Sequence, residues 1–430
     1  MNQFIFRFNS EDDFKTSNVL FDTNIAAKDQ YTYTFYRKPM RLYQFPEMFS
    51  HAGLDLFYIS LMVFFADRKI KRKLSDDAWT RQFKIYAPVL EVDKWNENKD
   101  LLERMISFLS GDKWTFEFRK RGLTSIEKKI EKGIKRIKKK IVIDKFCMLS
   151  GGLDSFIGAI DLLKTNKNVA FVGHYGGGKG VKPFQEIINK QLIDTYQLDN
   201  KLFFNFHAKP LRGVEESTRT RSFMFFSHAI VLASGMNKEI ELIIPENGLI
   251  SLNIPLTNTR LGSSSTRTTH PYYMDLLQQL IANIGLKISL CNPYQFRTKG
   301  DMISECQDPE FLKNNIEKTM SCSHPDNDWK LRGEKPSHCG YCLPCSIRRA
   351  AIEKAYNDDS SSYRIPDFKM SNQARVELNS FKIGILEYNK QENHSFAIQN
   401  AGPILKDLVK YCTLYERGMN ELKSFLDKYD

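Results

Sequence analysis

The sequence lacks any apolar run long enough to span a bilayer. Its longest apolar stretch, Leu54 to Ala66, is short for a membrane helix and contains Asp55. The first residues, Met1-Asn-Gln-Phe, also lack the basic-then-apolar pattern of an export signal. We therefore expect a cytoplasmic protein with no membrane contact.

Cysteines are few, and half of them lie close together. The chain has 8 in 430 residues. In a reducing compartment, clustered cysteines bind metals and do not form disulfides. The remaining four are scattered and are typical of core positions: Cys147, Cys291, Cys306 and Cys412.

The composition is that of a globular protein. A hydrophobic content of 42% with 12% aromatic residues excludes wholesale disorder. A chain of 430 residues is long enough for two or three domains, each with a core.

Positive charge is concentrated in one segment. Between Arg119 and Lys145 there are twelve Lys or Arg against three Asp or Glu, a net charge of +9 out of +12 for the chain. Isoleucines recur at helical spacing in the same segment: Ile126, Ile130, Ile134, Ile137 and Ile141. The segment is either a contact for nucleic acid or an acidic protein surface, or a linking helix with solvated lysines. Charge runs alone say little about partners, so the second interpretation is favoured.

The first 118 residues show alternating or β-rich segments mixed with helical ones, and no cluster of residues that suggests chemistry. We expect an α+β accessory domain that gates the substrate or binds a partner. The expected strands are 4–8, 31–36, 81–86 and 112–119, and the expected helices are 51–66 and 101–109.

A glycine loop follows the basic segment. Ser150-Gly-Gly-Leu-Asp-Ser155 comes after the apolar, β-rich run 141–149 and before residues with helical apolar spacing. Such a turn directs backbone N–H groups and the positive end of a helix dipole at one point, which suits a phosphate. Asp154 would orient the loop or help to hold a metal ion bound to the phosphates. The loop is not of the Walker type, because no Gly-Lys-Ser/Thr follows.

Strands and helices alternate beyond the loop. Strands are expected at 169–173, 202–206 and 240–244, with helices at 184–196 and 217–236. This alternation predicts a doubly wound parallel sheet, covered on both faces, that binds ligands at the carboxyl ends of its strands. The glycine loop, the Gly173-His174 pair and the Glu246-Asn247 pair all follow strands. The loop 176–180 is expected to be a lid or a surface turn.

Polar side chains are dense between residues 219 and 270. Arginines suit phosphate or carboxylate recognition, and Glu246 suits a purine-like edge that offers N–H donors. We expect two or more of this group to line a pocket. Its members are Arg219, Arg221, Glu246, Asn247, Asn253, Arg260, Arg267 and His270.

A second specific motif lies near residue 340. Cys339, Cys342 and Cys345 form two overlapping Cys-x-x-Cys steps, and Cys322 lies upstream. Four thiolates satisfy tetrahedral Zn²⁺ with no open position, so a structural zinc site is predicted. An iron–sulfur cluster is the competing interpretation. With four cysteines available, the neighbouring histidines 324 and 338 are not needed as ligands.

The two motifs together resemble a known family. Ser-Gly-Gly-x-Asp-Ser is similar to the signature of the PP-loop ATP pyrophosphatases. The spacing Cys-x(16)-Cys-Gly-x-Cys-x-x-Cys-x-x-Arg resembles the 7-cyano-7-deazaguanine synthase (QueC-like) branch, as do the Arg219–Phe226 helix start, Pro293-Tyr294 and Lys299. The similarity covers residues 141–355, approximately, and its middle part matches only loosely.

The resemblance implies a Rossmann-like, PP-loop/HUP-type fold and an ATP-dependent reaction. ATP would adenylate the carboxylate of a 7-deazaguanine acid with release of pyrophosphate, and ammonia would displace AMP. Catalytic roles would fall to Asp154, Ser155, Arg221 and Lys299. ATP, with Mg²⁺, would contact Ser150, Gly151, Gly152, Leu153, Asp154, Ser155, Gly173 and His174.

Several features depart from the biosynthetic enzymes. The stretch Ile244 to Asn253 differs at the substrate loop, and both ends of the chain carry extra segments. This pattern is more similar to QueC-like subunits of bacterial anti-phage defence operons, such as the Qat system. There, the resemblance implies a protein partner from the same operon, with transfer to a protein amine.

Two alternative functions remain open. One is an RNA-modifying PP-loop enzyme, which the basic segment favours mildly, although no reactive cysteine stands out near the loop. The other is a non-catalytic ATP-binding subunit that scaffolds a defence complex.

The expected organisation has five parts. They are an α+β accessory domain (1–118), a basic amphipathic linking helix (119–140), a PP-loop domain (141–320), a four-cysteine zinc module (321–355) and a helical extension (356–430).

Overall fold

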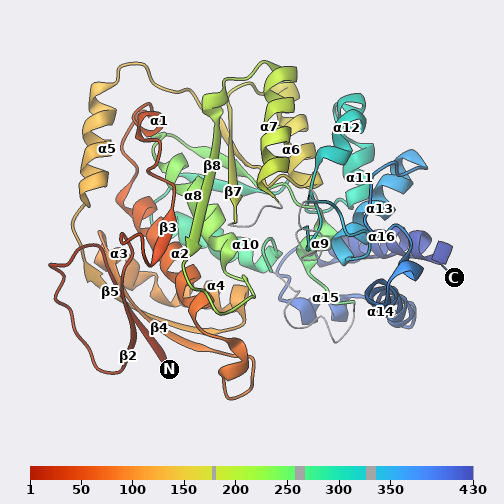
Figure 1. Cartoon of the computed structure of the whole chain (residues 1–430), viewed down its shortest axis with the longest axis horizontal. Helices are drawn as coiled ribbons and strands as arrows, with labels where there is room; N and C mark the ends of the chain where they lie inside the picture. Colours follow the sequence, from red (N-terminus) through yellow and green to blue (C-terminus); the bar gives the residue numbers. More distant parts are fainter. Residues whose placement is uncertain (177–180, 257–266, 326–335, 430) are drawn as a thin grey trace.

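Two sheets form the framework of the protein (Figure 1). The computed structural model describes residues 1–176, 181–256, 267–325 and 336–429. The predicted mixed α/β architecture with parallel sheets is confirmed. Among the described residues, no helix combines the length and the apolar character needed to cross a membrane.

The first sheet has the order β2-β1-β4-β5 and is parallel throughout. Its strands are β1 (Asn2–Arg7), β2 (Val19–Asn24), β4 (Gln82–Val89) and β5 (Lys113–Lys120). This differs from the expected α+β unit, because all four strands are parallel and helices lie between β2 and β4 and between β4 and β5. The crossovers contain α2 (His51–Lys69), α3 (Val92–Glu97) and α4 (Lys99–Ser110). Strand β2, which the sequence did not predict, is a partly exposed edge strand.

The second sheet has the order β10-β9-β6-β7-β8-β3. Its five parallel strands are β6 (Lys145–Met148), β7 (Val169–Tyr175), β8 (Phe203–Pro210), β9 (Ile240–Ile243) and β10 (Ile288–Cys291). The chain builds outward from β6 through β7 to β8. It then returns to the other side of β6 for β9 and β10. The strand order therefore reverses between β6 and β9.

Helices cover both faces of this sheet (Figure 1). Helix α8 (Arg221–Ser234) packs across β6, β7, β9 and β10, and α10 (Pro271–Asn283) packs on β10. Helices α6 (Leu153–Thr165) and α7 (Lys182–Tyr196) lie together on the other side. The apolar strands are thus buried from both sides, as their continuous hydrophobic runs predict.

The first 118 residues share a core with the second sheet. Strand β3 (Tyr31–Tyr33) pairs antiparallel with β8 and forms the edge of that sheet. Helix α2 is buried from Ala52 to Asp67, because β4 and α8 both pack against it. A helix that is apolar all round needs partners on every side. One hydrophobic core therefore extends from Phe4 to Ile352. The boundary expected at residue 118 does not divide this core into two.

The basic segment forms a shorter helix than predicted. Helix α5 (Ser125–Arg136) begins with a capping box between Thr124 and Glu127 and ends at Ile137. Ile130 and Ile134 are buried, as their spacing predicts. Gly133 allows the close approach of α1 (Pro39–Leu42), because a Cβ there would lie 2.3 Å from the ring of Tyr43.

The last part of the chain is helical. It contains α11 (Lys299–Ser304), α12 (Pro309–Asn315), α13 (Leu343–Tyr356), α14 (Asn372–Asn389), α15 (Ser395–Ala401) and α16 (Leu408–Leu426). Leu378, Phe381 and Leu414 belong to a second core that these helices share with Leu252 of α9 (Gly248–Leu252). The extension therefore packs on the second sheet's loops.

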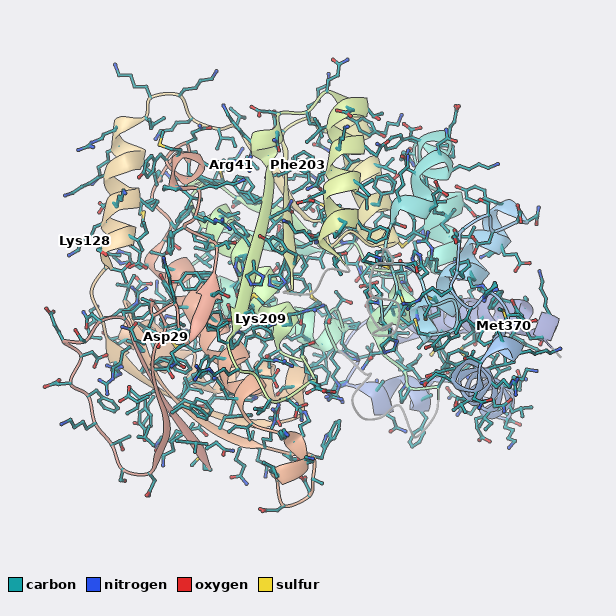
Figure 2. The ribbon with its side chains drawn as sticks, viewed as in Figure 1. Asp29, Arg41, Lys128, Phe203, Lys209 and Met370 are labelled. Carbon is teal, nitrogen blue, oxygen red and sulfur yellow. The ribbon has the colours of Figure 1, made fainter. Side chains whose placement is uncertain are left out.

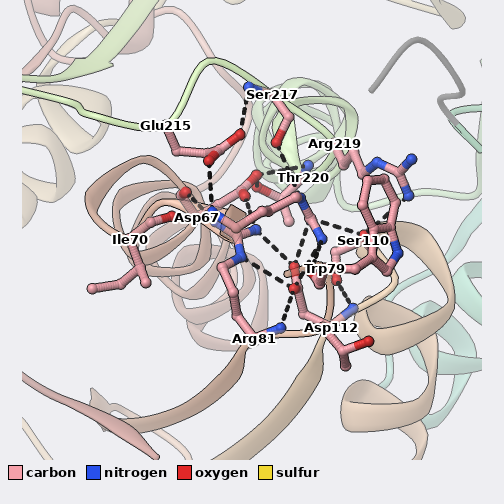
Figure 3. Close-up of polar contacts among 12 residues, drawn as sticks. Asp67, Ile70, Trp79, Arg81, Ser110, Asp112, Glu215, Ser217, Arg219 and Thr220 are labelled. Atoms are coloured by element: carbon pink, nitrogen blue, oxygen red, sulfur yellow. Dashed lines mark hydrogen bonds and ion pairs between the residues drawn. The ribbon is translucent and has the colours of Figure 1, made fainter. Parts of the chain in front are cut away.

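A buried ion network joins the first 118 residues to α8 (Figure 3). The Arg81 guanidinium contacts the carboxylates of Asp67 at 2.5 Å and Asp112 at 2.7 Å. Arg72 reaches Asp112 at 2.7 Å. Asp67 also accepts hydrogen bonds from the Thr220 N–H (3.2 Å) and hydroxyl (2.7 Å), directly before α8. The network therefore fixes the start of that helix.

Replacement of Arg81 by Met is expected to lower the free energy of unfolding by about 3–5 kcal/mol, because the fully buried Asp67 carboxylate loses its cationic partner. Urea unfolding measures the change. Lys84→Met, at a partly exposed pair with Glu117, is the control and should cost less than about 1 kcal/mol. Equal losses in the two variants would contradict the role of the network.

Candidate functional site

The glycine loop lies where β6 ends and α6 begins. Gly151 has φ of +91°, a left-handed conformation that favours glycine. A Cβ on Gly151 would lie 2.9 Å from Cγ of Gln185. Gly152 is the N-cap of α6, so the first N–H groups of that helix point out of its end beside the loop. The sequence thus folds here into a tight, anion-compatible turn.

Two serine hydroxyls form hydrogen bonds within the loop. Ser155 Oγ accepts a hydrogen bond from the Ser150 N–H at 3.2 Å and donates to the Gly152 carbonyl at 2.9 Å. The Ser150 and Ser155 hydroxyl oxygens are 3.1 Å apart. Both hydroxyls are therefore in the loop, where they could contact a bound anion.

Gln185 of α7 also shapes this region. Its amide nitrogen donates to the carbonyls of Ser150 at 2.9 Å and His174 at 3.1 Å, which joins the ends of β6 and β7. Sequence reasoning missed this residue because a single glutamine in a helix carries no local signal. Its burial and its two backbone contacts identify it.

Asp154 is the centre of a buried polar cluster. One carboxylate oxygen forms an ion pair with Lys299 at the start of α11. The other accepts hydrogen bonds from the side chain of Asn247 at 2.7 Å and from its N–H at 3.2 Å. Asp154 and Lys299 are each 6% exposed. The Asn247 amide also contacts Glu246 at 3.4 Å.

The charges of this cluster are strongly perturbed. Burial alone would raise the pKa of Asp154, but Lys299, Glu246 and Asn247 outweigh it and lower that pKa to about 2. Burial and the neighbouring Asp154 carboxylate raise the pKa of Glu246 well above its ordinary value. Asp154 is therefore the ionised partner of Lys299, and Glu246 holds a proton that it shares with Asp154.

The cluster lies where the strand order reverses. Asp154 follows β6, and Glu246 and Asn247 follow β9, the neighbouring strand on the other side. Asn292, which follows β10, donates to the Glu246 carbonyl at 2.8 Å. Ligands of open α/β sheets bind in the crevice at such a reversal, outside the carboxyl ends of the strands. The structure thus brings Asp154, Glu246, Asn247 and Lys299 together.

The other residues expected at the nucleotide lie at the end of β7. Gly173 packs closely, because a Cβ there would be 2.4 Å from Oδ1 of Asn205. His174 Nε2 accepts a hydrogen bond from the Ala208 N–H at 3.3 Å. Burial, His228 and Arg221 lower the pKa of His174, so the ring is neutral. Its side chain is buried between the sheet and Phe225 and His228 of α8, so the contact it could offer a ligand is through its backbone.

Arg221 is exposed at the start of α8. Phe225 lies one turn farther along, and its ring is 5.9 Å from that of His174. Residues four apart share a helix face, so Arg221 lies on the face toward the end of β7. Its positive charge also lowers the pKa of His174, which shows that the two side chains are near each other.

Three expected pocket residues instead contact the first 118 residues or cap a helix beside them. Arg219 lies over the Trp79 ring at 4.6 Å, and Arg267 donates to the Phe108 carbonyl at 2.8 Å (Figure 3 shows Arg219). His270 accepts a hydrogen bond from the Tyr272 N–H at 3.2 Å and caps α10. These side chains therefore hold the junction between α4, α8 and α10.

The two other predicted pocket positions are Asn253 and Arg260. Asn253 has a left-handed backbone at the C-terminal cap of α9. Arg260 and the loop residues 177–180 lie outside the described residues.

No protein-family model and no curated protein matches this chain.

The four clustered cysteines converge on one point. Their sulfur atoms all lie within 4.8 Å of one another, with Cys322 and Cys342 4.0 Å apart and Cys339 and Cys345 3.9 Å apart. A tetrahedral ion with bonds of about 2.3 Å places its sulfur ligands about 3.8 Å apart. The geometry fits one Zn²⁺ ion better than a cluster of several irons, whose cysteines bind separate metal atoms.

The cysteine cluster is tied to the glycine loop. Immediately before Cys322, the Met320 N–H donates to the Gly151 carbonyl at 2.8 Å. The Ser321 hydroxyl accepts from the Leu153 N–H at 3.4 Å. Ser321 is the second neighbour of the loop that sequence reasoning missed. A metal bound by the four thiolates would therefore also fix residues 320 and 321, which contact the glycine loop.

His338 and Arg348 support the same segment. His338 Nε2 accepts a hydrogen bond from the Ser321 N–H at 3.2 Å, so this ring nitrogen is occupied. The buried Arg348 guanidinium donates to the Thr319 hydroxyl and the Ile316 carbonyl, each at 2.6 Å. Arg348, the last residue of the cysteine motif, thus fixes the segment 316–319 that leads to Cys322.

Replacement of Glu246 by Gln is expected to change the pH dependence of stability. The folded protein keeps the Glu246 proton to higher pH than the unfolded chain does, so wild-type stability falls as pH rises above the ordinary glutamate pKa. Gln carries no titrating proton, and the stability of the variant relative to wild type should increase between about pH 5 and about pH 8. Urea unfolding across this range measures it. Glu305→Gln, at an exposed position, should run parallel to wild type. Parallel curves for Glu246→Gln would show that Glu246 is ionised in the fold.

Replacement of Cys339 by Ser is expected to remove a bound metal. Elemental analysis of the purified wild-type protein should find about one zinc per chain, and the variant should hold far less, because three thiolates leave the tetrahedron open. Cys412→Ser, outside the cluster, is the control and should keep its zinc. Iron in place of zinc, or unchanged zinc in Cys339→Ser, would overturn the assignment.

Proposed function

We propose that this chain is a PP-loop ATP pyrophosphatase of the QueC-like type, which activates a carboxylate as its adenylate. The observation that carries the proposal is the position of Ser150-Gly-Gly-Leu-Asp-Ser155. The loop joins a central parallel strand to a helix N-terminus at the reversal of strand order. Backbone N–H groups, two hydroxyls and the helix dipole meet there, as phosphate binding requires.

Two further features support the proposal. The parallel order β8-β7-β6-β9-β10 matches the 3-2-1-4-5 order of Rossmann-like sheets, with the glycine loop after the first strand. The cysteine cluster that follows the nucleotide domain contacts the loop directly through residues 320 and 321. Both features are expected of the family that the sequence resembles.

The loop would bind the triphosphate of ATP. Gly151 and Gly152 allow phosphate oxygens close to the backbone. The Ser150 and Ser155 hydroxyls, which form hydrogen bonds within the loop here, would turn to donate to a bound phosphate. Asp154 has both carboxylate oxygens engaged, by Lys299 and Asn247, so we assign it the role of orienting the loop. Both oxygens of Asp154 are therefore already used within the fold, and Mg²⁺ would be held by the phosphates of ATP.

The reaction has two steps. An oxygen of the substrate carboxylate attacks the α-phosphorus of ATP, and the bond from that phosphorus to the bridging oxygen breaks, which releases pyrophosphate. Ammonia or a protein amine then attacks the acyl carbon and displaces AMP, losing a proton. Arg221, which lies near His174 at the end of β7, would stabilise negative charge on the phosphates during the first step.

A 7-deazaguanine acid would suit a site beside Glu246, which follows β9. A protonated carboxyl offers one oxygen that donates, here toward Asp154, and a second that accepts. The second oxygen can accept from the N–H groups of a purine-like edge. This hydrogen-bonding pattern is the chemical basis for the proposed substrate. The defence context that the resemblance implies concerns only which amine receives the activated acid.

Replacement of Ser155 by Ala is expected to reduce pyrophosphate release by about 10²-fold or more, because a donor in the loop and two of its closing contacts are lost. A coupled assay with a 7-deazaguanine acid measures pyrophosphate, with AMP and ADP separated by chromatography. Ser424→Ala, at an exposed serine of α16, is the control and should keep the wild-type rate.

The products distinguish the alternatives. AMP with pyrophosphate that depends on the acid supports the proposal, and ADP contradicts it. ATP binding without turnover would favour the non-catalytic subunit. A wild-type rate in Ser155→Ala would remove the glycine loop from the reaction.

A further inference from the structure

Helix α5 carries a row of exposed cations far from the glycine loop. Lys128, Lys129, Lys132, Lys135 and Arg136 are all exposed on this helix (Figure 2 labels Lys128). Glu131 is the acid among them, and Lys135 pairs with it at 2.7 Å. In the described part of the chain, Lys128, Lys129, Lys132 and Arg136 have no ion-pair partner. The helix therefore presents uncompensated positive charge to solvent.

The row continues beyond the helix. Lys138 and Lys139 are exposed in the segment that follows α5. The Ile141 N–H donates to the Gln44 carbonyl at 2.8 Å, which fixes this segment beside α1. Arg37 and Lys38, at the start of α1, are exposed as well. Both elements lie at the same edge of the molecule (Figure 1).

A groove of about 600 Å³ runs between the two helices. Met40 and Tyr43 of the α1 region line one side. The other side is lined by α5 residues, four of them cationic: Lys128, Lys129, Lys132 and Arg136. The close packing of Gly133 on Tyr43 makes the groove a fixed feature of the fold.

We propose that this basic groove, defined by α5, the 137–140 segment and the start of α1, binds the sugar–phosphate backbone of nucleic acid. A row of long, unpaired ammonium groups, roughly one turn apart along a helix, matches a line of phosphates. The groove itself is lined mainly by cations and apolar side chains, so phosphate contacts dominate and binding is independent of sequence.

A protein partner fits this surface less well. Lysine is depleted in protein–protein interfaces, whose centres are apolar and rich in aromatic residues. Here the exposed apolar side chains are few, Met40 on the groove and Val142 beyond it, and no large aromatic side chain is among the exposed ones. Charge, and not apolar area, dominates the surface.

The proposal is independent of the nucleotide site. None of its residues contacts the glycine loop or the cysteine cluster in the described structure, so either assignment can fail alone. The proposal also replaces the interpretation that the sequence favoured, in which the basic segment is a linking helix with solvated lysines. The isoleucines do pack, as expected of a linking helix, but the lysines line a groove shared with a second element.

Fluorescence anisotropy tests the proposal on the full-length protein. The probes are a labelled DNA duplex and an RNA hairpin of equal length, titrated at several salt concentrations between about 50 mM and about 200 mM. With about five phosphate contacts, the logarithm of the DNA association constant should fall with the logarithm of salt with a slope of about −4.5. The two probes show which nucleic acid is preferred.

Charge reversal locates the site. The triple variant Lys128→Glu, Lys129→Glu, Lys132→Glu should reduce the magnitude of the slope by about 3 and the affinity at least about tenfold. These side chains are exposed, so the fold is retained, and circular dichroism checks it. The matched control reverses three exposed lysines elsewhere, Lys73, Lys313 and Lys369.

The control variant has the same net charge as the test variant and should keep most of the affinity and the slope. No binding to either probe at the lowest salt would overturn the proposal. An equal loss in both triple variants would also overturn it, because binding would then follow net charge and not the groove.

Discussion

The buried ion pair between Asp154 and Lys299 is the constraint on which the candidate site depends. Two charges removed from water are costly unless each finds further partners. Asp154 meets this demand by accepting from Asn247 and by sharing the Glu246 proton. Asn247 in turn caps α9, and Lys299 belongs to the capped start of α11. Loops that follow three different elements are thereby fixed around one carboxylate, next to the glycine turn.

A second set of buried charges makes the first 118 residues part of the same structural unit. Asp67 balances Arg81 and also holds the Thr220 N–H and hydroxyl at the entrance to α8. Arg221 is the next residue, so its placement depends on residues more than 100 positions earlier. The first sheet is therefore better described as a support for α8 than as an appended module.

The sequence predicted the features that rest on local patterns. Strand–helix alternation predicted the second sheet. Glycines 151 and 152 predicted a tight turn, and Gly151 does have a left-handed backbone. Cysteine spacing predicted four sulfurs around one point. The parallel pairing of the first sheet and the pairing of β3 with β8 depend on contacts between distant residues, which no local pattern encodes.

The same limit applies to the site. Arg219 and Arg221 are two residues apart in sequence, yet a helix start turns them in different directions, toward Trp79 and toward the end of β7. Gln185 and Ser321 act through backbone contacts of a kind that residue type does not reveal. The ion pair of Asp154 with Lys299 spans 145 positions. Only the fold could bring these two charges together.

The placement of Tyr31–Tyr33 at the edge of the second sheet has a consequence for biosynthesis. This strand leaves the ribosome long before β8, its only pairing partner among the described strands, which ends at Pro210. One apolar side of α2 stays uncovered for longer, until α8 (Arg221–Ser234) has been made. The nascent chain therefore carries an unpaired strand edge and an uncovered helix face until residues 203–234 have been made, and the packing of the two sheets waits for that stage.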